Sequence, residues 1–417
     1  MRVLFIHQNF PGQYRHLAPA LARRGGNEIV AIAERSAPGL DGIELLRYQP
    51  ARSTSSAMHP WAMDFETKII RADAAVRLAA DLRAKGFTPD IVCAHPGWGE
   101  ALLIKEIWPN SKLLYYFEFF YSARDADVAF DPEFKEDDPY FGSRVRMKNT
   151  NHVMSLLDCD WGVSPTAWQH KQFPQIFRPK ISVIHDGIDT DLVRPRANVE
   201  VKLNRDGVTL RPGDEIVTFV NRNLEPVRGY HIFMRALPDI LRARSRAHAI
   251  IIGTDQVSYG KGPPPGTTYR QIFMDEVKDR LDLSRVHFVG RVPYSVFLNV
   301  LRVSAAHVYL TYPFVLSWSM LEAMAMECLL VASRTPPVTE VVEHGRDGLL
   351  VDFFSPAELA ANVVAALERP GSFADLRKNA RKKIVERYDL KRVCLPRQIE
   401  LVDTIAAGRT PAPGAPA

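Results

Sequence analysis

Cysteines and long apolar runs are scarce in this sequence. Among its 417 residues are four cysteines, which stand far apart and never as a C-x-x-C pair: Cys93, Cys159, Cys328 and Cys394. This spacing argues against a disulfide framework and against a zinc site. No apolar run approaches the roughly 20 residues that cross a bilayer as a helix. The opening stretch, Met1–His7, is a short apolar run ending on a polar side chain, which indicates a buried strand rather than a signal peptide. We therefore expect a cytoplasmic protein.

A strong charge of either sign is missing as well. The 53 basic and 48 acidic residues leave a net charge of +5, and the chain is 46% hydrophobic and 24% charged. This ordinary globular balance excludes intrinsic disorder for most of the chain. The small positive surplus suits a phosphate-bearing ligand, or peripheral contact with the anionic inner face of a membrane. It lacks the concentrated basic stripe of a nucleic-acid binder, so we expect no nucleic-acid partner.

Apolar runs alternate with amphipathic segments in two successive series. The strands expected in the first series are Val3–Ile6, Glu28–Ala33, Ile91–Cys93, Lys112–Tyr116, Trp161–Ser164 and Ile181–Ile184. Those expected in the second are Ile216–Val220, Ala249–Ile252, Val286–Val289, Val308–Leu310, Leu329–Ala332 and Leu349–Val351. Such alternation predicts an α/β fold with two Rossmann-like, doubly wound parallel sheets. Ligands of these folds bind at the carboxyl ends of the strands, so two such domains facing each other would form a central cleft there.

A polar stretch, residues 196–215, has no helical or strand period and separates the two series. We expect one domain over residues 1–195 and a second over 196–385. A C-terminal helix at 386–409 is expected to pack back on the first domain. The tail at 410–417 is rich in proline and alanine and cannot build a core, so we expect it to be disordered.

The loop after the first expected strand, His7–Gln13, contains Gly12 and opens a helix. Backbone N–H groups at a helix N-terminus suit a phosphate or a sugar hydroxyl. A plain Pro-Gly turn is the alternative interpretation. The loop does not read G-x-G-x-x-G, so a dinucleotide site has no support here.

Two arginines, Arg222 and Arg228, follow the first strand of the second series, close to the entry of the next helix. Two fixed cations there can clamp a diphosphate through bidentate hydrogen bonds that lysine cannot reproduce. Surface arginines paired with Glu225 are the alternative.

An acid, Glu322, lies in a helix that we expect to begin near Ser317. A carboxylate in the first turns of a helix meets the positive end of the dipole. It can also accept hydrogen bonds from vicinal hydroxyls such as those of a ribose. A solvent-facing helix acid is the alternative.

These loops, in this order, resemble those of the retaining glycosyltransferases of family four, which have the GT-B fold. The family's Gly-Arg-Leu-x-x-x-Lys-Gly is similar to Asn221–Gly229, and its Leu-Glu-Ala-Met-Ala matches Leu321–Ala325. Its Ile-Pro-Asn-Gly-Val-Asp-x-x-x-Phe-x-Pro is matched by Ile184–Pro195, and its Pro-Glu-Val-Val…Gly-x-x-Gly-x-Leu-Val by Thr339–Val351. The resemblance covers nearly the whole chain and is weaker across residues 34–110.

The resemblance implies roles for particular residues. Arg222 and Arg228 would bind the donor diphosphate and stabilise the charge that grows on it as the sugar departs. Glu322 would hold the nucleotide ribose. The first domain would bind the acceptor and the second domain the nucleotide sugar. Further donor-binding candidates are Gly12 in the first loop, Arg291 and Val292 where the family receives the base, and Leu316, Ser317 and Ser319 at the helix start.

Two positions depart from the family pattern. Phe314 stands where the first acid of a Glu-x7-Glu motif would bind donor-sugar hydroxyls, so the identity of the sugar does not carry over. Relatives often have a histidine after the strand that corresponds to Lys112–Tyr116, and here Glu118 takes that place.

Glu118 is a candidate catalytic residue. Ionised, it would steady positive charge near the anomeric carbon or orient the acceptor. As a nucleophile it would support double displacement, which we rank below front-face return, where the leaving phosphate oxygen takes the acceptor proton. A buried acid paired with Arg124 or Arg144 is the alternative. The flanking aromatic residues are expected to raise the pKa of Glu118 by desolvation.

His95, at the end of another first-series strand, is a second catalytic candidate, as an acceptor ligand or a base. A structural histidine is the alternative.

The metal-binding triplet Asp-x-Asp occurs three times, at 125–127, 158–160 and 189–191, which shows how common the pattern is. Arg222 and Arg228 already supply the cations that a metal ion would provide. We therefore predict no metal requirement and no cofactor besides the nucleotide sugar as co-substrate.

Together these features predict a hexosyltransferase-type enzyme of glycan or glycoconjugate biosynthesis. It would move a sugar, with retention, from a UDP- or GDP-sugar to a hydroxyl of a sugar, lipid-linked or small-molecule acceptor. The alternatives are a nucleotide-sugar epimerase of the same fold and a nucleotide-sugar-binding partner without catalysis, the latter motivated by Phe314. The sugar, the base, the acceptor and the oligomeric state stay open.

Overall fold

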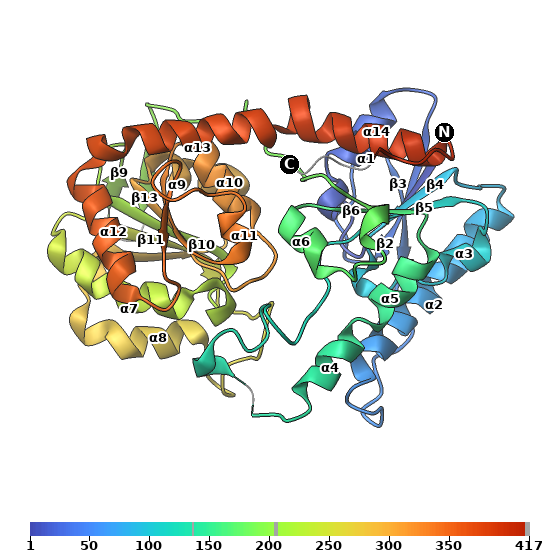
Figure 1. The fold of residues 1–417 in the computed structure, drawn as a ribbon, viewed down its shortest axis with the longest axis horizontal. Helices are drawn as coiled ribbons and strands as arrows, with labels where there is room; N and C mark the ends of the chain where they lie inside the picture. Colours follow the sequence, from blue (N-terminus) through green and yellow to red (C-terminus); the bar gives the residue numbers. More distant parts are fainter. Residues whose placement is uncertain (136, 204–206, 413–417) are drawn as a thin grey trace. The chain divides into compact units, whose positions relative to one another are not determined.

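The computed structural model describes residues 1–135, 137–203 and 207–412 of the chain. They form two compact units, each with its own parallel sheet (Figure 1). Unit 1 comprises Met1–Arg124, Glu136–Gly187 and Leu390–Ala417, and unit 2 comprises Asp125–Lys135 and Ile188–Asp389. The expected α/β fold with two doubly wound parallel sheets is confirmed.

Unit 1 contains a seven-stranded sheet in the order β3-β2-β1-β4-β5-β6-β7, and all its neighbouring strands run parallel. The strands are β1 (Arg2–Ile6), β2 (Glu28–Glu34), β3 (Glu44–Tyr48), β4 (Ile91–Ala94), β5 (Lys112–Tyr116), β6 (Trp161–Ser164) and β7 (Ile181–Val183). All six strands expected in the first series are confirmed. β3 has no counterpart among them, because this edge strand is mostly half-exposed and lacks a continuous apolar run.

Both faces of this sheet are covered by helices. Val3 and Phe5 of β1 pack with α1 (Leu17–Arg23) and α14 (Leu395–Ala406). Leu4 and Ile6 point to the opposite face, because successive strand residues alternate, and they share a core with α2 (Met63–Ala84). The remaining helices of the unit are α3 (Ile104–Ile107), α4 (Phe141–Lys148), α5 (Thr150–Asp158) and α6 (Ala167–Gln172).

Unit 2 contains a six-stranded sheet in the order β12-β11-β10-β13-β14-β15, again with parallel neighbours. Its strands are β10 (Ile216–Asn223), β11 (His248–Thr254), β12 (Val286–Gly290), β13 (Ala306–Tyr309), β14 (Leu329–Ser333) and β15 (Leu349–Val351). The six strands expected in the second series are confirmed.

The helices of unit 2 also cover both faces of its sheet. They are α7 (Tyr230–Ala243), α8 (Tyr269–Val277), α9 (Tyr294–Val303), α10 (Trp318–Ala325), α11 (Pro336–Thr339), α12 (Pro356–Glu368) and α13 (Ala374–Arg387). Ile216 of β10 shares a core with α9, α10 and α13. Phe219 of the same strand faces the other way and stacks on Phe233 of α7, with ring centroids 4.6 Å apart.

The connection between the two series differs from the expectation. The stretch 196–215 contains an antiparallel hairpin of β8 (Val201–Leu203) and β9 (Val208–Leu210), while residues 204–206 lie outside the described part of the chain. A strand of three residues is too short to show the alternation of apolar and polar side chains by which strands are predicted from a sequence. The chain enters unit 2 after Gly187, whereas residue 195 is the expected boundary, because Ile188 pairs with Asp389 of unit 2.

The final helical segment is divided rather than continuous. α13 belongs to unit 2, a π-helical turn follows at Leu390–Cys394, and α14 belongs to unit 1. Apolar residues of α14 enter the core around β1: Leu401, Val402 and Ile405. The helix expected at 386–409 is therefore not one element: its first residues end α13, and its later part contains α14, which packs on the sheet of unit 1. Of the expected tail 410–417, residues 413–417 lie outside the described residues.

One segment between β5 and α4 belongs to unit 2, although the chain before and after it belongs to unit 1. We call this segment, Asp125–Lys135, the strap. Its two phenylalanines lie against aromatic rings of unit 2: Phe130 on Tyr312 and Phe354, and Phe134 on His231 and Phe273. The expected first domain, 1–195, is therefore interrupted by the strap.

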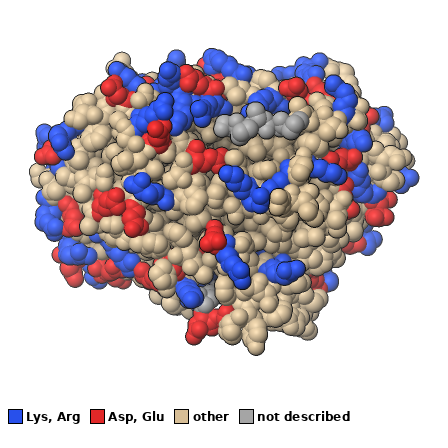
Figure 2. All heavy atoms as spheres, in the orientation of Figure 1, with Lys and Arg blue, Asp and Glu red and all other residues tan. Residues whose placement is uncertain are grey.

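The surface agrees with the modest net charge. Figure 2 shows basic and acidic side chains interspersed over the face in view. Among the described helices, none is long and apolar enough to cross a bilayer. The four cysteines are buried and none forms a disulfide.

Gly187, the last residue of unit 1 before the chain enters unit 2, has a left-handed backbone with φ of 90°. A Cβ at this position would lie 2.7 Å from Cα of Leu390. We expect Gly187→Ala to lower the free energy of unfolding by about 2–5 kcal/mol, because overpacking adds to the unfavourable backbone conformation. Urea denaturation followed by circular dichroism measures this loss.

Gly213→Ala is the matched control. Gly213 also has a left-handed φ, of 101°, but a Cβ there would meet no atom within 4 Å. The free energy of unfolding of this variant should fall by only ~1–2 kcal/mol, the cost of holding alanine in a left-handed backbone conformation. Equal losses in the two variants would contradict the steric explanation.

Candidate active site

The predicted residues of unit 1 lie after three neighbouring strands. Gly12 is in the loop after β1, His95 directly follows β4, and Glu118 lies two residues after β5. β1 and β4 pair with each other, although β2 and β3 come between them in the sequence, so the strand order reverses here. Doubly wound sheets bind ligands at such reversal points. The structure thus brings all three residues to the carboxyl edge where a ligand would bind.

The Glu118 carboxylate has polar neighbours from two other loops. Its Oε1 accepts a hydrogen bond from Nε2 of Gln13 at 3.1 Å, and its Oε2 lies 3.7 Å from Nε2 of His95. The Gln169 side chain donates to the backbone carbonyl of Glu118 at 2.6 Å, which fixes the loop. The Glu118 side chain remains 33% exposed, so it is held in place and still accessible.

His95 has a defined orientation. Its Nδ1 accepts a hydrogen bond from the N–H of Gly97 at 3.0 Å, which assigns the ring proton to Nε2, the nitrogen that faces Glu118. The ring packs against Trp98 and Tyr116, with centroids 4.3 and 5.6 Å away. His95 therefore belongs to the Glu118 cluster.

His7 and Gln13 extend this cluster, although no spacing in the sequence singles them out. Nε2 of His7 lies 2.6 Å from Oε1 of Gln13, so the Gln13 amide presents its NH2 group to Glu118. Gly12, with φ of 47°, leaves room for the His7 ring, because a Cβ would lie 2.2 Å from it. The loop leads into a 3-10 turn, Gly12–Tyr14, and α1 begins only at Leu17, which corrects the expectation that it opens a helix directly.

The electrostatics of the cluster favour an ionised Glu118 beside a neutral His7. Burial raises the pKa of Glu118, but His95, His7 and Gln13 lower it by more, so the net pKa is below its ordinary value. The expected upward shift is therefore wrong. Burial, and then the neighbouring His95, lowers the pKa of His7 to about 3. Pairing of Glu118 with an arginine is not seen among the described residues, where Arg144 pairs with Asp138.

Arg228, in unit 2, is a buried cation. It ends a 3-10 turn after β10 and is 7% exposed. Its Nη1 donates hydrogen bonds to Oγ1 of Thr311 at 2.8 Å and to the carbonyl of Val315 at 2.9 Å. Within the described parts of the chain, the guanidinium forms no ion pair, and Nε and Nη2 have no acceptor. The Glu225 carboxylate attracts it only from beyond ion-pair distance. A buried charge without a direct ion-pair partner is unfavourable, so this position favours an anionic ligand.

Two aromatic rings flank the Arg228 guanidinium. Its Cζ lies 5.5 Å from the ring centroids of both Tyr259 and Phe314, and these two rings are 4.8 Å apart. Cation–π contacts of this kind orient a guanidinium. Phe314, which replaces an acid of the family pattern, thus forms part of the wall around Arg228. Tyr259 comes from a Gly- and Pro-rich loop that offers no periodic signal.

Arg222 lies near the end of β10 and is exposed. The alternative in which Glu225 pairs with the arginines is not seen in the part of the chain that the structure describes. Instead, Glu225 accepts the N–H groups of Ser258 and Tyr259, at 3.2 and 2.9 Å. Burial raises the pKa of Glu225 despite these bonds. Arg228 and Arg222 act on the Glu225 carboxylate through their charges but form no described ion pair with it, so neither guanidinium is tied to an acid at contact distance.

Glu322 lies in the second turn of α10, behind the N-cap residue Ser317, which confirms the expected helix start. Its side chain is buried, and Oε1 accepts a hydrogen bond from the Tyr294 hydroxyl at 2.6 Å. The solvent-facing alternative is therefore wrong. Tyr294 opens α9, just after the exposed Arg291 and the half-buried Val292, and it links the ribose and base candidates. A tyrosine at a helix start has no distinctive spacing, so the sequence does not single it out.

Two N–H groups at the start of α10 are already engaged. The N–H of Ser317 donates to the Tyr309 hydroxyl at 2.8 Å, and that of Ser319 to Oγ of Ser317 at 3.3 Å. Leu316, beside them, is buried. A phosphate bound by these groups would have to replace both bonds, so the arginines are the stronger anion ligands.

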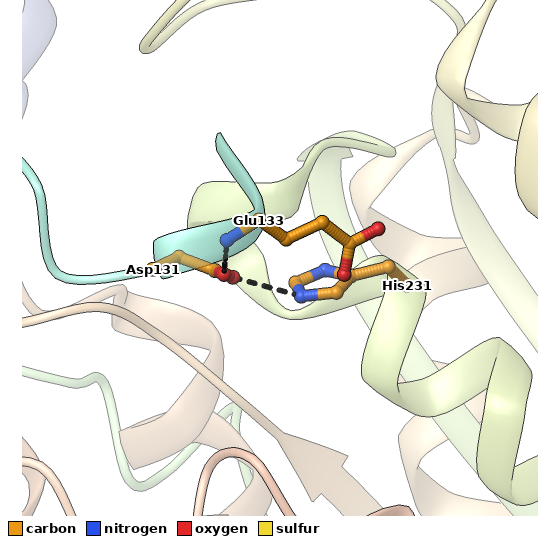
Figure 3. A group of neighbouring side chains, drawn as sticks. All are labelled: Asp131, Glu133 and His231. Carbon is orange, nitrogen blue, oxygen red and sulfur yellow. Dashed lines mark hydrogen bonds and ion pairs between the residues drawn. The ribbon is translucent and has the colours of Figure 1, made fainter. Parts of the chain in front are cut away.

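Asp131, Glu133 and His231 bring atoms of the type that bind metals within 4.8 Å of one another (Figure 3). Asp131 Oδ2 lies 3.0 Å from Nε2 of His231. The Glu133 carboxylate accepts two hydrogen bonds from Arg235, at 2.7 and 2.8 Å. Because a guanidinium already holds Glu133, we interpret the group as an ion-pair network.

Two family models match the chain. The family described as "Glycosyl transferase family 4 group" matches residues 25–193. The family described as "Glycosyl transferases group 1" matches residues 201–383.

Curated relatives share part of the sequence. D-inositol 3-phosphate glycosyltransferase 2 of Catenulispora acidiphila is 25% identical over 203 residues, which are 48% of this chain and 45% of that protein. D-inositol 3-phosphate glycosyltransferase of Acidothermus cellulolyticus is 28% identical over 210 residues, 48% of this chain and 43% of that protein. The match thus spans less than half the length of these relatives.

Solved structures resemble the chain over nearly its whole length. Sucrose-phosphate synthase from Thermosynechococcus elongatus has a TM-score of 0.72 at 16% identity, over 98% of this chain and 100% of that one. HepE from Anabaena, in complex with UDP-glucose, has a TM-score of 0.64 at 16% identity, over 97% of this chain and 100% of that one. At such identities the likeness concerns the fold.

We expect His95→Phe to raise the pKa of Glu118. The phenylalanine preserves the packing against Trp98 and Tyr116 but removes the imidazole that opposes the effect of burial. A carbon-13 NMR titration of the glutamate carboxyl groups, with Glu118→Gln to assign the signal, measures the change.

His185→Phe is the control, because the buried His185 is not among the groups that shift Glu118. It should leave the Glu118 titration where it is in the wild type. An unchanged or lowered Glu118 pKa in His95→Phe would refute the assigned electrostatics.

Proposed function

Because the chain belongs to the family-four glycosyltransferases of the GT-B fold, we propose that it is a hexosyltransferase-type enzyme using a nucleoside-diphosphate sugar. One observation carries the proposal: Arg228 is a buried cation with no described carboxylate at ion-pair distance, and it lies at the carboxyl end of the central strand β10. A diphosphate is an anion of the kind that this position favours. UDP- and GDP-sugars are the proposed donors, and the UDP-glucose complex of the structurally similar HepE supports the first.

In this proposal unit 2 binds the donor. Arg228 and Arg222 hold the diphosphate, and Glu322 accepts hydrogen bonds from the ribose hydroxyls. As the bond to the sugar breaks, negative charge grows on the diphosphate. A guanidinium already oriented by Thr311, Val315 and two aromatic rings stabilises that charge without reorganising. Two arginines at the leaving group would also stabilise its negative charge, which is what a metal ion would otherwise do. We therefore propose metal-independent transfer.

The acceptor is proposed to bind to unit 1, near Glu118 and His95. The lowered pKa of Glu118 keeps its carboxylate ionised at neutral pH, where it can orient an acceptor hydroxyl or steady positive charge on the departing sugar. We propose retention by front-face return, in which the leaving phosphate oxygen takes the acceptor proton. Relatives named for D-inositol 3-phosphate make a polyol phosphate a reasonable first acceptor to test.

Arg228→Ala and Arg222→Ala should each lower turnover by about 10²–10³-fold, because each removes a cation from the growing charge on the leaving group. Nucleotide release from UDP- and GDP-sugars, measured in the presence of an acceptor, checks this result. Circular dichroism verifies that each variant is folded.

Arg246→Ala is the matched control, since the Arg246 side chain is 83% exposed and pairs with Glu215 of unit 2, away from Arg222 and Arg228 in the sequence. Its turnover should equal that of the wild type. Near-normal turnover in either Arg222→Ala or Arg228→Ala would contradict the diphosphate assignment. Nucleotide binding without release, with every acceptor offered, would favour a binding protein over an enzyme.

Glu118→Gln should lower kcat by about 10²-fold and leave the Kd for UDP or GDP unchanged. The reason is that Glu118 belongs to unit 1, whereas the proposed diphosphate ligands belong to unit 2. Steady-state kinetics together with isothermal titration calorimetry separate the two effects. Glu44→Gln, on the exposed start of β3, serves as control. Weaker nucleotide binding with unchanged kcat in Glu118→Gln would reverse the assignment of donor and acceptor.

A further inference from the structure

The strap places a buried carboxylate inside unit 2. Asp131 is 3% exposed and lies between the two aromatic anchors of the strap, Phe130 and Phe134. Its Oδ2 accepts a hydrogen bond from the Tyr312 hydroxyl at 2.8 Å and lies 3.0 Å from Nε2 of the equally buried His231 (Figure 3). Its Oδ1 accepts the N–H of Glu133 at 3.0 Å.

Both side-chain partners of Asp131 belong to the segments that hold Arg228. His231 lies in the first turn of α7, three residues after Arg228. Tyr312 follows Thr311, whose hydroxyl accepts a hydrogen bond from Arg228, and it precedes Val315, whose carbonyl accepts another. The backbone N–H of Tyr312 also donates to the carbonyl of Val227 at 2.9 Å. Asp131 therefore links two backbone segments, one containing His231 and the other Tyr312, and these segments orient the Arg228 guanidinium.

We propose that Asp131 is a positioning residue for Arg228, and that the strap thereby sets the affinity of unit 2 for the nucleoside diphosphate. The inference rests on the proposed function, in which Arg228 binds that diphosphate. Asp131 itself does not touch the ligand in this account. Its charge and its hydrogen bonds to Tyr312 and His231 hold the two segments in one arrangement, so the guanidinium meets the phosphates already oriented.

The strap also carries a matched control. Asp125 opens the strap and is exposed. Its left-handed backbone, with φ of 55°, is one that Asn adopts as readily as Asp. Asp125→Asn therefore changes the charge of the strap by the same amount as Asp131→Asn without touching Tyr312 or His231.

The test is isothermal titration calorimetry of the full-length protein with UDP, GDP and ADP, at a temperature well below its melting point. Asp131→Asn and Tyr312→Phe should each weaken binding of the preferred diphosphate by about tenfold, the scale of one charge-assisted hydrogen bond. Asp125→Asn should bind as the wild type does. A merely structural role for Asp131 would lower the melting temperature and leave the Kd of the folded protein unchanged.

A double-mutant cycle with Arg228→Lys then shows whether the effect passes through Arg228. Lysine keeps the positive charge but not the fixed guanidinium, so Asp131→Asn should add little further loss in that background. If Asp131→Asn does not fold, Tyr312→Phe replaces it in the cycle.

Wild-type affinity in folded Asp131→Asn or Tyr312→Phe overturns the inference. So does an Asp131→Asn substitution that weakens diphosphate binding as much in the Arg228→Lys background as it does in the wild type. Either result leaves the proposed function standing, provided that the wild type binds a diphosphate through Arg228. A wild type that binds none of the three diphosphates overturns the proposed function, and this inference with it.

Discussion

The positive charge of Arg228 is the constraint on which the rest of unit 2 depends. A guanidinium that is only 7% exposed, with no described carboxylate at ion-pair distance, is tolerated where neutral groups hold it and an anionic ligand can bind beside it. Thr311 and Val315 accept its hydrogen bonds, and Tyr259 and Phe314 flank it. The left-handed turn at Gly229, where a Cβ would lie 2.3 Å from Leu310, brings this loop close to the end of β13. Each feature fixes a cation at the reversal point of the strand order.

Unit 1 stabilises a negative charge where unit 2 holds a positive one. There the charge in question is the Glu118 carboxylate, and the surrounding groups favour its ionised form. His95 and Gln13 face the carboxylate, while burial keeps His7 neutral, so that it serves as a hydrogen-bond donor to Gln13. In the proposed reaction, one unit would offer a preorganised cation to the leaving phosphate, and the other an anion suited to an acceptor hydroxyl or a developing oxocarbenium ion.

The strands of both sheets could be predicted from the sequence because they are buried on both sides and read as continuous apolar runs. Arg228, Glu118 and His95 could be singled out as candidates because they follow those strands, and Arg222 because it lies at the end of one. Gln13 and Tyr294 could not, since each acts through a contact with a residue far away in the sequence. The position of Asp131 was equally hidden, because nothing in a polar loop between two elements of unit 1 indicates that it packs in unit 2. The sequence predicts a raised pKa for Glu118 because its aromatic neighbours are adjacent in the sequence, whereas the histidines that lower this pKa lie in loops after other strands.

A crystal structure of the protein soaked with UDP or GDP tests the central claim most directly. The account predicts density for the diphosphate within hydrogen-bond distance of Nε or Nη2 of Arg228 and of the Arg222 guanidinium, with the ribose hydroxyls at Glu322. Nucleotide density that places the diphosphate away from Arg228, in a structure where Arg228 keeps the orientation described above, would contradict it.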